Sequence, residues 1–207
     1  RMRVVPESQL AYINPPRTAT MSIERMLKRA TGNAVRSPSR RYSGHHTVYE
    51  PQWEDYHWFV SVRHPYTRAI SIWRRVIEHM NLRNRQWKAV LLPDQRGFEQ
   101  VLLNAAPYVR HYWQNMSCKQ FTDAAPRVDS VVHQETLAED FNKLPRLNSR
   151  IKDQRFPVHH VSRDKTAWHT HFTPACIDFV QEVFSRDFEE YGYNRDFEAV
   201  KQGEYRA

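Results

Sequence analysis

Two short segments of the sequence combine hydroxyl side chains with arginines in a pattern suited to binding phosphate. The first covers Ile13–Ser22 and the second covers Phe59–Ser71. Each is typical of a strand that runs through a turn into a helix. The free backbone N–H groups and the helix dipole at such a junction both favour an anion. Two junctions of this kind in one small domain predict a ligand that carries phosphate at two places.

The first junction combines small residues, hydroxyls and a guanidinium group. Thr18, Ala19 and Thr20 are small enough to let the backbone approach a ligand closely. Thr20 and Ser22 can donate hydroxyl hydrogen bonds, and Arg17 can donate charge-assisted ones. The glycines of the nucleotide-triphosphatase loop are missing, so that pattern is excluded on spacing. The alternative is that Thr20 or Ser22 only caps the helix and that Arg17 is a surface charge.

The second junction places Arg63 after an aromatic and β-branched strand expected over His57–Val62. Ligands of open α/β sheets usually bind at this carboxyl end of a strand. Pro65 suits the first position of the following helix. Arg68 and Ser71 lie three residues apart on that helix and therefore share a face. Arg63 and Ser71 could hold one phosphate from two sides, and the alternative is a helix with ordinary surface arginines.

Composition limits the class of protein and favours an anionic partner. The 207 residues are 40% hydrophobic and 26% charged, which fits one globular domain. Thirty-one Lys and Arg against 23 Asp and Glu give a net charge of +8, which favours a nucleotide, a nucleic acid or an acidic glycan. A solvated basic surface is the alternative. Cys118 and Cys176 are too few for a disulfide scaffold or a zinc site of cysteines, although one bridge stays open.

The order of expected elements predicts an α/β domain with a mainly parallel sheet. Strands are expected over 10–14, 57–62 and 128–133, with helices between and after them. Thr136–Glu139 has the spacing of a capping box that opens a helix. Thr173 and Pro174 suit the N-cap and first position of the last long helix. We expect a single domain over residues 1–207.

Taken together, the two junctions resemble the sulfotransferase family that uses 3′-phosphoadenosine 5′-phosphosulfate (PAPS). Pro16–Ser22 is similar to the family loop Pro-Lys-Thr-(Ala/Gly)-(Ser/Thr)-Thr-Ser, which holds the 5′-phosphosulfate. Arg63–Ser71 matches the full pattern Arg-x-Pro-x-x-Arg-x-x-Ser, which holds the 3′-phosphate. Weaker similarities follow at Val132–Phe141, His159–Lys165 and Phe188–Tyr193. The pattern is most similar to the carbohydrate-type branch, which includes uronyl 2-O-sulfotransferases.

The resemblance implies a three-layer P-loop-like fold, with a central mainly parallel sheet flanked by helices. It also implies transfer of a sulfuryl group from PAPS to a hydroxyl or amine of a carbohydrate or small molecule. The product nucleotide would be adenosine 3′,5′-bisphosphate, and no metal is expected. The implied cofactor-binding residues are Arg17, Thr18, Ala19, Thr20, Met21, Ser22, Arg63, Arg68, Ser71, Ser162 and Lys165.

Two residues of the first loop depart from the family pattern. Arg17 stands where the family has lysine; it keeps the charge and offers a bidentate fork, but it never gives up its proton. Arg17 could therefore stabilise charge during transfer without donating a proton. Met21 replaces a hydroxyl residue, which removes one possible ligand to the phosphate.

Sulfuryl transfer needs an in-line acceptor, cations on the transferring group and a base for the acceptor hydroxyl. His45 and His46 precede the second strand, where the carbohydrate branch places a catalytic histidine. The ordinary pKa of histidine suits a base near neutral pH. We expect His46 to be the base, with His45 and then Glu50 as alternatives. Each of them could instead be a loop residue or a structural side chain.

Two other classes of protein compete with this interpretation. A kinase-like nucleotide enzyme would need a glycine-rich loop and a magnesium site, and neither is evident in the sequence. A basic nucleic-acid-binding domain would fit the charge, but no helix-turn-helix, zinc or RNA-binding signature supports it. We expect a nucleotide cosubstrate and a hydroxyl acceptor as partners, with neither nucleic acid nor membrane. An anionic acceptor is one alternative that the net charge allows. No apolar run reaches membrane length; we expect a cytoplasmic microbial or viral protein, with a eukaryotic Golgi-lumen domain as the alternative.

Overall fold

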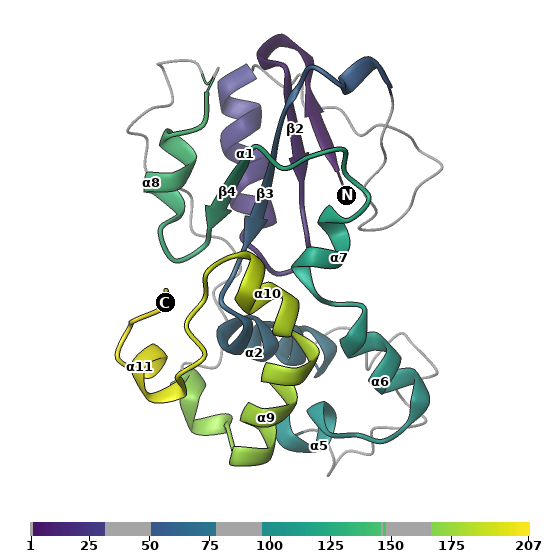
Figure 1. Ribbon diagram of the computed structural model, residues 1–207, viewed down its shortest axis with the longest axis vertical. Coiled ribbons are helices and arrows are strands. Elements are labelled where there is room, and N and C mark those ends of the chain that lie inside the picture. Colours follow the sequence, from purple (N-terminus) through teal and green to yellow (C-terminus); the bar gives the residue numbers. More distant parts are fainter. Residues whose placement is uncertain (1, 32–50, 78–96, 146, 148–166) are drawn as a thin grey trace. The chain divides into compact units, whose positions relative to one another are not determined.

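A computed structural model describes residues 2–31, 51–77, 97–145, 147 and 167–207 (Figure 1). The chain divides into two compact units. Unit 1 comprises Arg1–Arg63 and Cys118–Val161, and unit 2 comprises His64–Ser117 and Ser162–Ala207. The chain enters unit 2 between Arg63 and His64, inside the second sequence motif. One domain over residues 1–207 stays a prediction.

Unit 1 contains a four-stranded sheet in the order β1-β2-β3-β4. The strands are β1 (Arg3–Val5), β2 (Leu10–Ile13), β3 (His57–Val62) and β4 (Ser130–His133). β1 pairs with β2 antiparallel, whereas β2, β3 and β4 are parallel to one another. The three parallel strands therefore end at the same edge of the sheet.

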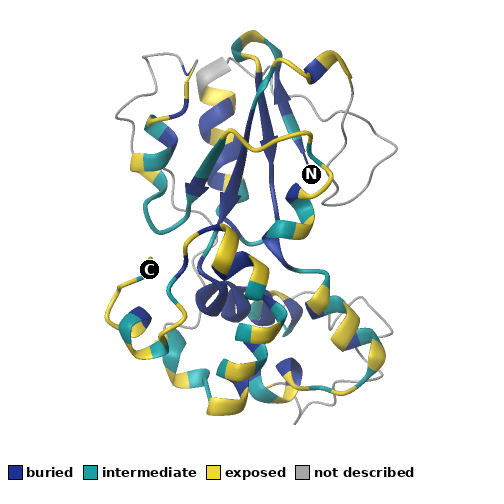
Figure 2. Ribbon diagram, viewed as in Figure 1, coloured by how far each residue is buried: buried dark blue, intermediate teal, exposed yellow. Residues whose placement is uncertain are grey.

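The two central strands are buried on both faces, which explains why their sequences are almost continuously apolar (Figure 2). One face packs on α1 (Thr20–Thr31) and α8 (Leu137–Asn142). The core on this side includes Leu10, Tyr12, Ile23, Met26, Leu27, Phe59, Val132 and Phe141. On the other face Ala11, Ile13, Trp58, Val60 and Val62 are buried as well.

The other elements that the structure describes in unit 1 are short. They are η1 (Pro6–Ser8), η2 (Pro51–Trp53) and α7 (Cys118–Thr122). The indole N–H of Trp58 donates to the carbonyl of Trp53 at 3.1 Å, which ties η2 to β3.

Unit 2 is helical. Its described residues form α2 (Pro65–Arg75), α5 (Phe98–Leu102), α6 (Pro107–Gln114), η4 (Trp168–His171), α9 (Pro174–Val183), α10 (Ser185–Glu190) and α11 (Phe197–Lys201). The N-cap of α9 is Thr173, whose hydroxyl accepts from the N–H of Cys176, as its sequence predicts. In the part of the chain that the structure describes, no helix is long and apolar enough to cross a membrane.

The predicted α/β class is confirmed: the sheet is central, mainly parallel and flanked by helices. The predicted capping box at the start of α8 is wrong. Thr136 is the N-cap residue, but its hydroxyl donates to Asp140 at 3.0 Å instead of accepting from the helix backbone. Glu139 pairs with Lys143 on the surface. The carboxylate of Asp140 competes successfully for the Thr136 side chain.

Cys118 and Cys176 are both buried, and neither is in a disulfide. Cys118 begins α7 and Cys176 lies in the first turn of α9. The bridge that the sequence left open does not form.

Candidate functional site

The loop between β2 and α1 has an unusual backbone. Arg17 has φ 70° and Ala19 has φ 62°, so two non-glycine residues on either side of Thr18 lie in the left-handed region. Each such residue costs about 1–3 kcal/mol and persists only where the surroundings hold it there. Left-handed residues in a turn can direct successive N–H groups into one concavity, which is a common way of binding anions.

The first turn of α1 adds amides to this loop. The N–H groups of Ser22 and Ile23 donate to the carbonyl of Ala19 at 3.0 and 3.1 Å. The first N–H groups of a helix have no intrahelical partner, so those of Thr20 and Met21 are the ones that an anion could use. Met21 itself is 44% exposed and stands beside the loop as a thioether in place of a hydroxyl.

Arg63 lies at the same edge of the sheet as this loop, because β2 and β3 are parallel neighbours. It directly follows Val62, the last residue of β3, and is half-buried. β4 ends beside it: Val62 is opposite His133, and the N–H of Gln134 donates to the Val62 carbonyl at 2.9 Å. The carboxyl edge of the unit 1 sheet therefore brings together the predicted residues of the first loop and Arg63.

A partly buried ion pair fixes α1 against the sheet. Arg3 of β1 donates to both carboxylate oxygens of Glu24 at 2.9 and 3.1 Å, and the side-chain amide of Asn14 donates to the same carboxylate at 3.2 Å. Asn14 opens the loop and Glu24 lies in α1. This cluster ties both ends of the loop to one edge strand.

A second carboxylate organises the end of β4. Asp140 accepts from the backbone N–H of His133 and from the hydroxyl of Thr136, and its Oδ2 lies 2.9 Å from Nδ1 of the His133 ring. Burial alone would raise the pKa of Asp140, but these hydrogen bonds from His133 and Thr136 outweigh it, so the pKa lies below its ordinary value. Asp140 therefore stays ionised and holds His133 in place.

In unit 2, α2 begins with a histidine cap. Nδ1 of His64 accepts from the N–H of Tyr66 at 3.3 Å, and its Nε2 lies 2.9 Å from the Asn194 carbonyl. Because a carbonyl can only accept, Nε2 carries the proton and the ring is the neutral tautomer. Pro65 occupies the first helical position, as its sequence predicts.

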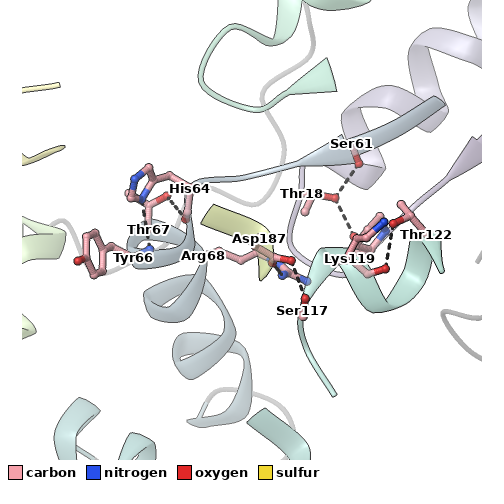
Figure 3. A network of polar contacts seen from close by, with 11 residues as sticks. Thr18, Ser61, His64, Tyr66, Thr67, Arg68, Ser117, Lys119, Thr122 and Asp187 are labelled. Atoms are coloured by element: carbon pink, nitrogen blue, oxygen red, sulfur yellow. Dashed lines mark hydrogen bonds and ion pairs between the residues drawn. The ribbon is translucent and has the colours of Figure 1, made fainter. Parts of the chain in front are cut away.

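Arg68 of α2 lies in a buried ion pair (Figure 3). Its Nη1 is 3.2 Å from Oδ2 of Asp187 in α10, and the hydroxyl of Ser117 donates to Oδ1 of Asp187 at 2.6 Å. Ser71, one turn further along α2, is buried too. The contacts of Arg68 give it a structural role in unit 2, and its assignment to the cofactor stays a prediction.

Other predicted site residues lie outside the described residues. They are His45, His46, Glu50, Ser162 and Lys165. Their roles stay predictions. Among the described residues, no group of three or more His, Cys, Asp or Glu is arranged to hold a metal ion.

A comparison with protein families identifies the family of this chain. A family model described as "Sulfotransferase family" matches residues 1–194. The chain belongs to the sulfotransferase family. Membership supports a transferase that moves sulfuryl groups, and the family generally takes them from PAPS. No curated protein and no solved structure matches the chain of this sulfotransferase.

The structure of this sulfotransferase also contains supporting residues that sequence reasoning missed. Ser61 of β3 lies 2.7 Å from both the Tyr12 and the Thr18 hydroxyls, and Asp187 is the partner of Arg68. A weak signal existed for each. Ser61 is a lone hydroxyl inside an apolar strand, and Asp187 is a lone carboxylate between Phe184 and Phe188.

Proposed function

We propose that this sulfotransferase moves a sulfuryl group from PAPS to a hydroxyl or amine of a carbohydrate or small molecule. The observation that carries the proposal is the β2–α1 loop. Its two left-handed residues and the start of α1 lie at the same sheet edge as Arg63, in a chain of the sulfotransferase family. In this proposal residues 16–22 hold the 5′-phosphosulfate, and Arg63, at the same edge of the sheet, holds the 3′-phosphate.

The residues present fit an anion of this kind. The loop offers amides at a helix N-terminus and one guanidinium group, and the described part of the loop and of the first turn of α1 carries no carboxylate. The nearest carboxylate in the sequence, Glu24, is neutralised by Arg3. An anion would therefore meet donors and positive charge without a competing negative side chain.

Each side chain has a defined task in the proposed reaction. Bound PAPS supplies an activated sulfuryl group on a phosphate leaving group. Arg17 donates charge-assisted hydrogen bonds as negative charge gathers on that leaving group, and it keeps its own proton throughout. A histidine, His46 or His45, takes the proton of the acceptor hydroxyl as its oxygen attacks sulfur. That the acceptor is of the carbohydrate type is also part of this proposal.

Calorimetric titration with adenosine 3′,5′-bisphosphate, with AMP and ATP as controls, tests the proposal. We expect binding that is stronger than that of either control and that is lost in Arg63→Ala. The matched variant is Arg29→Ala, which removes the same charge from the exposed face of α1 and should bind like the parent chain. Equal binding of ATP, or an equal loss in both variants, would point to a general anion surface and contradict the proposal.

A further inference from the structure

Three hydroxyl groups and one carbonyl form a directed chain beneath the β2–α1 loop. Ser61 Oγ lies 2.7 Å from Thr18 Oγ1 (Figure 3). The Tyr12 hydroxyl lies 2.7 Å from Ser61 Oγ on one side, and Thr18 Oγ1 lies 2.7 Å from the Pro15 carbonyl on the other. The Tyr12, Thr18 and Ser61 side chains have no exposure to solvent. Each hydrogen bond of the chain is therefore made away from water.

The chemistry of the groups fixes the direction of this chain. A carbonyl can only accept, so Thr18 donates its single hydroxyl proton to Pro15. Thr18 must then accept from Ser61, and Ser61 in turn must accept from Tyr12. Burial raises the pKa of Tyr12, against the opposite effect of its hydrogen bond to Ser61, so Tyr12 keeps the proton that it donates.

The chain ends at the residue that separates the two left-handed positions. Thr18 lies between Arg17 and Ala19, and its side chain reaches Ser61 of β3. The hydroxyl of Thr20 donates to the Pro15 carbonyl as well, at 3.2 Å. The loop backbone is therefore anchored at its centre to the sheet and at its start to the first turn of α1.

We propose that Ser61 and Tyr12 are positioning residues for the anion loop. By donating along one chain to Thr18, they hold residues 17–19 in the conformation that directs the loop amides outward. The Thr18 hydroxyl donates its only proton to the Pro15 carbonyl. Thr18 therefore shapes the loop and contributes only its backbone to a ligand. The inference rests on the proposed function for the nature of that ligand, but not for the loop conformation.

Substitutions along the chain separate positioning from ordinary packing. Ser61→Ala removes the central hydroxyl. Tyr12→Phe removes only the first donor and keeps the ring, whose centroid lies 4.7 Å from that of the stacked Phe59 ring. Ser130→Ala is the control, because it removes a hydroxyl that contacts the His57 ring at the other end of the sheet. Ser61→Thr restores a hydroxyl at the central position.

The first measurement is amide hydrogen exchange of residues 16–22 in the nucleotide-free protein. We expect exchange to accelerate about threefold to tenfold in Ser61→Ala, less in Tyr12→Phe, and not in Ser130→Ala, with α8 unchanged in all variants. The second is the affinity for adenosine 3′,5′-bisphosphate, which should fall by a similar factor in Ser61→Ala and recover in part in Ser61→Thr.

The two measurements test the inference and the proposed function independently of each other. Unchanged loop exchange in both Ser61→Ala and Tyr12→Phe overturns the inference, whatever binds. Accelerated loop exchange in a chain that binds no adenosine 3′,5′-bisphosphate at all overturns the proposed function and supports the inference. If Ser61→Ala does not fold, the loop exchange of Tyr12→Phe is compared with that of Ser130→Ala. Faster exchange in Tyr12→Phe supports the inference, and equal exchange overturns it.

Discussion

Replacing Arg68 by methionine should destabilise the nucleotide-free protein by about 3–5 kcal/mol, because it leaves a buried carboxylate without its cation. The side chains of Arg68 and Asp187 are 0% and 1% exposed, and their closest N and O atoms are 3.2 Å apart. After the substitution, Asp187 keeps the hydrogen bond from Ser117. One hydrogen bond contributes about 1 kcal/mol net and does not offset the desolvation of a full charge. Methionine replaces most of the apolar stem, so little of the loss comes from packing.

Urea denaturation monitored by circular dichroism and by tryptophan fluorescence measures this loss, and two probes are needed because the chain has two compact units. The double variant Arg68→Met/Asp187→Leu removes both charges and should recover most of the stability. The control is Lys201→Met, which breaks an exposed pair with Glu198 in the same unit. It should change the free energy of unfolding by less than about 1 kcal/mol.

The outcome also distinguishes a structural arginine from a ligand. A residue that serves only to bind phosphate leaves the stability of the nucleotide-free protein almost unchanged when it is removed. A loss below about 1 kcal/mol in Arg68→Met, combined with a large loss of nucleotide affinity, would refute the reasoning from burial. Arg68 would then be a direct contact of the cofactor.

Two further predictions concern the carboxylates of unit 1. The pKa of Asp140 lies below its ordinary value in the folded protein, so its ionised form stabilises the fold above about pH 4 and this contribution is lost as the pH falls further. Asp140→Asn should therefore lower the urea midpoint at pH 7 and flatten its fall in acid; an unchanged acid profile would contradict the assigned hydrogen bonds from His133 and Thr136. Glu24→Gln should cost about 1–3 kcal/mol, because the carboxylate accepts two hydrogen bonds from Arg3, and a urea midpoint equal to that of the parent chain would contradict this.

The sequence predicted those parts of the fold that depend on local patterns. The strand over His57–Val62 and the helices expected after the two junctions follow from apolar runs and helix-start residues, and all three are confirmed. The edge strand Arg3–Val5 was missed, because three residues are too few to show a period.

The supporting contacts of the site could not be predicted in the same way. Arg68 and Asp187 are 119 residues apart, and Ser61 and Thr18 are 43 apart. Pairs at such separations are set by the packing of whole elements, and no local pattern encodes them. The failed capping box has a different, local origin: the side chain of Asp140, four residues further on, outcompetes the backbone for Thr136.

The burial of the two cysteines gives each unit its own reporter of local opening. Cys118 belongs to unit 1 and Cys176 to unit 2, neither is exposed, and the chain has no third thiol. The cysteine thiolate attacks an alkylating reagent, so either sulfur is labelled only when the surrounding structure opens. Labelling rates of the two cysteine peptides, resolved by mass in one sample, therefore measure the opening free energy of each unit separately. The native sequence thus allows local opening of the sheet unit and of the helical unit to be compared without any engineered probe.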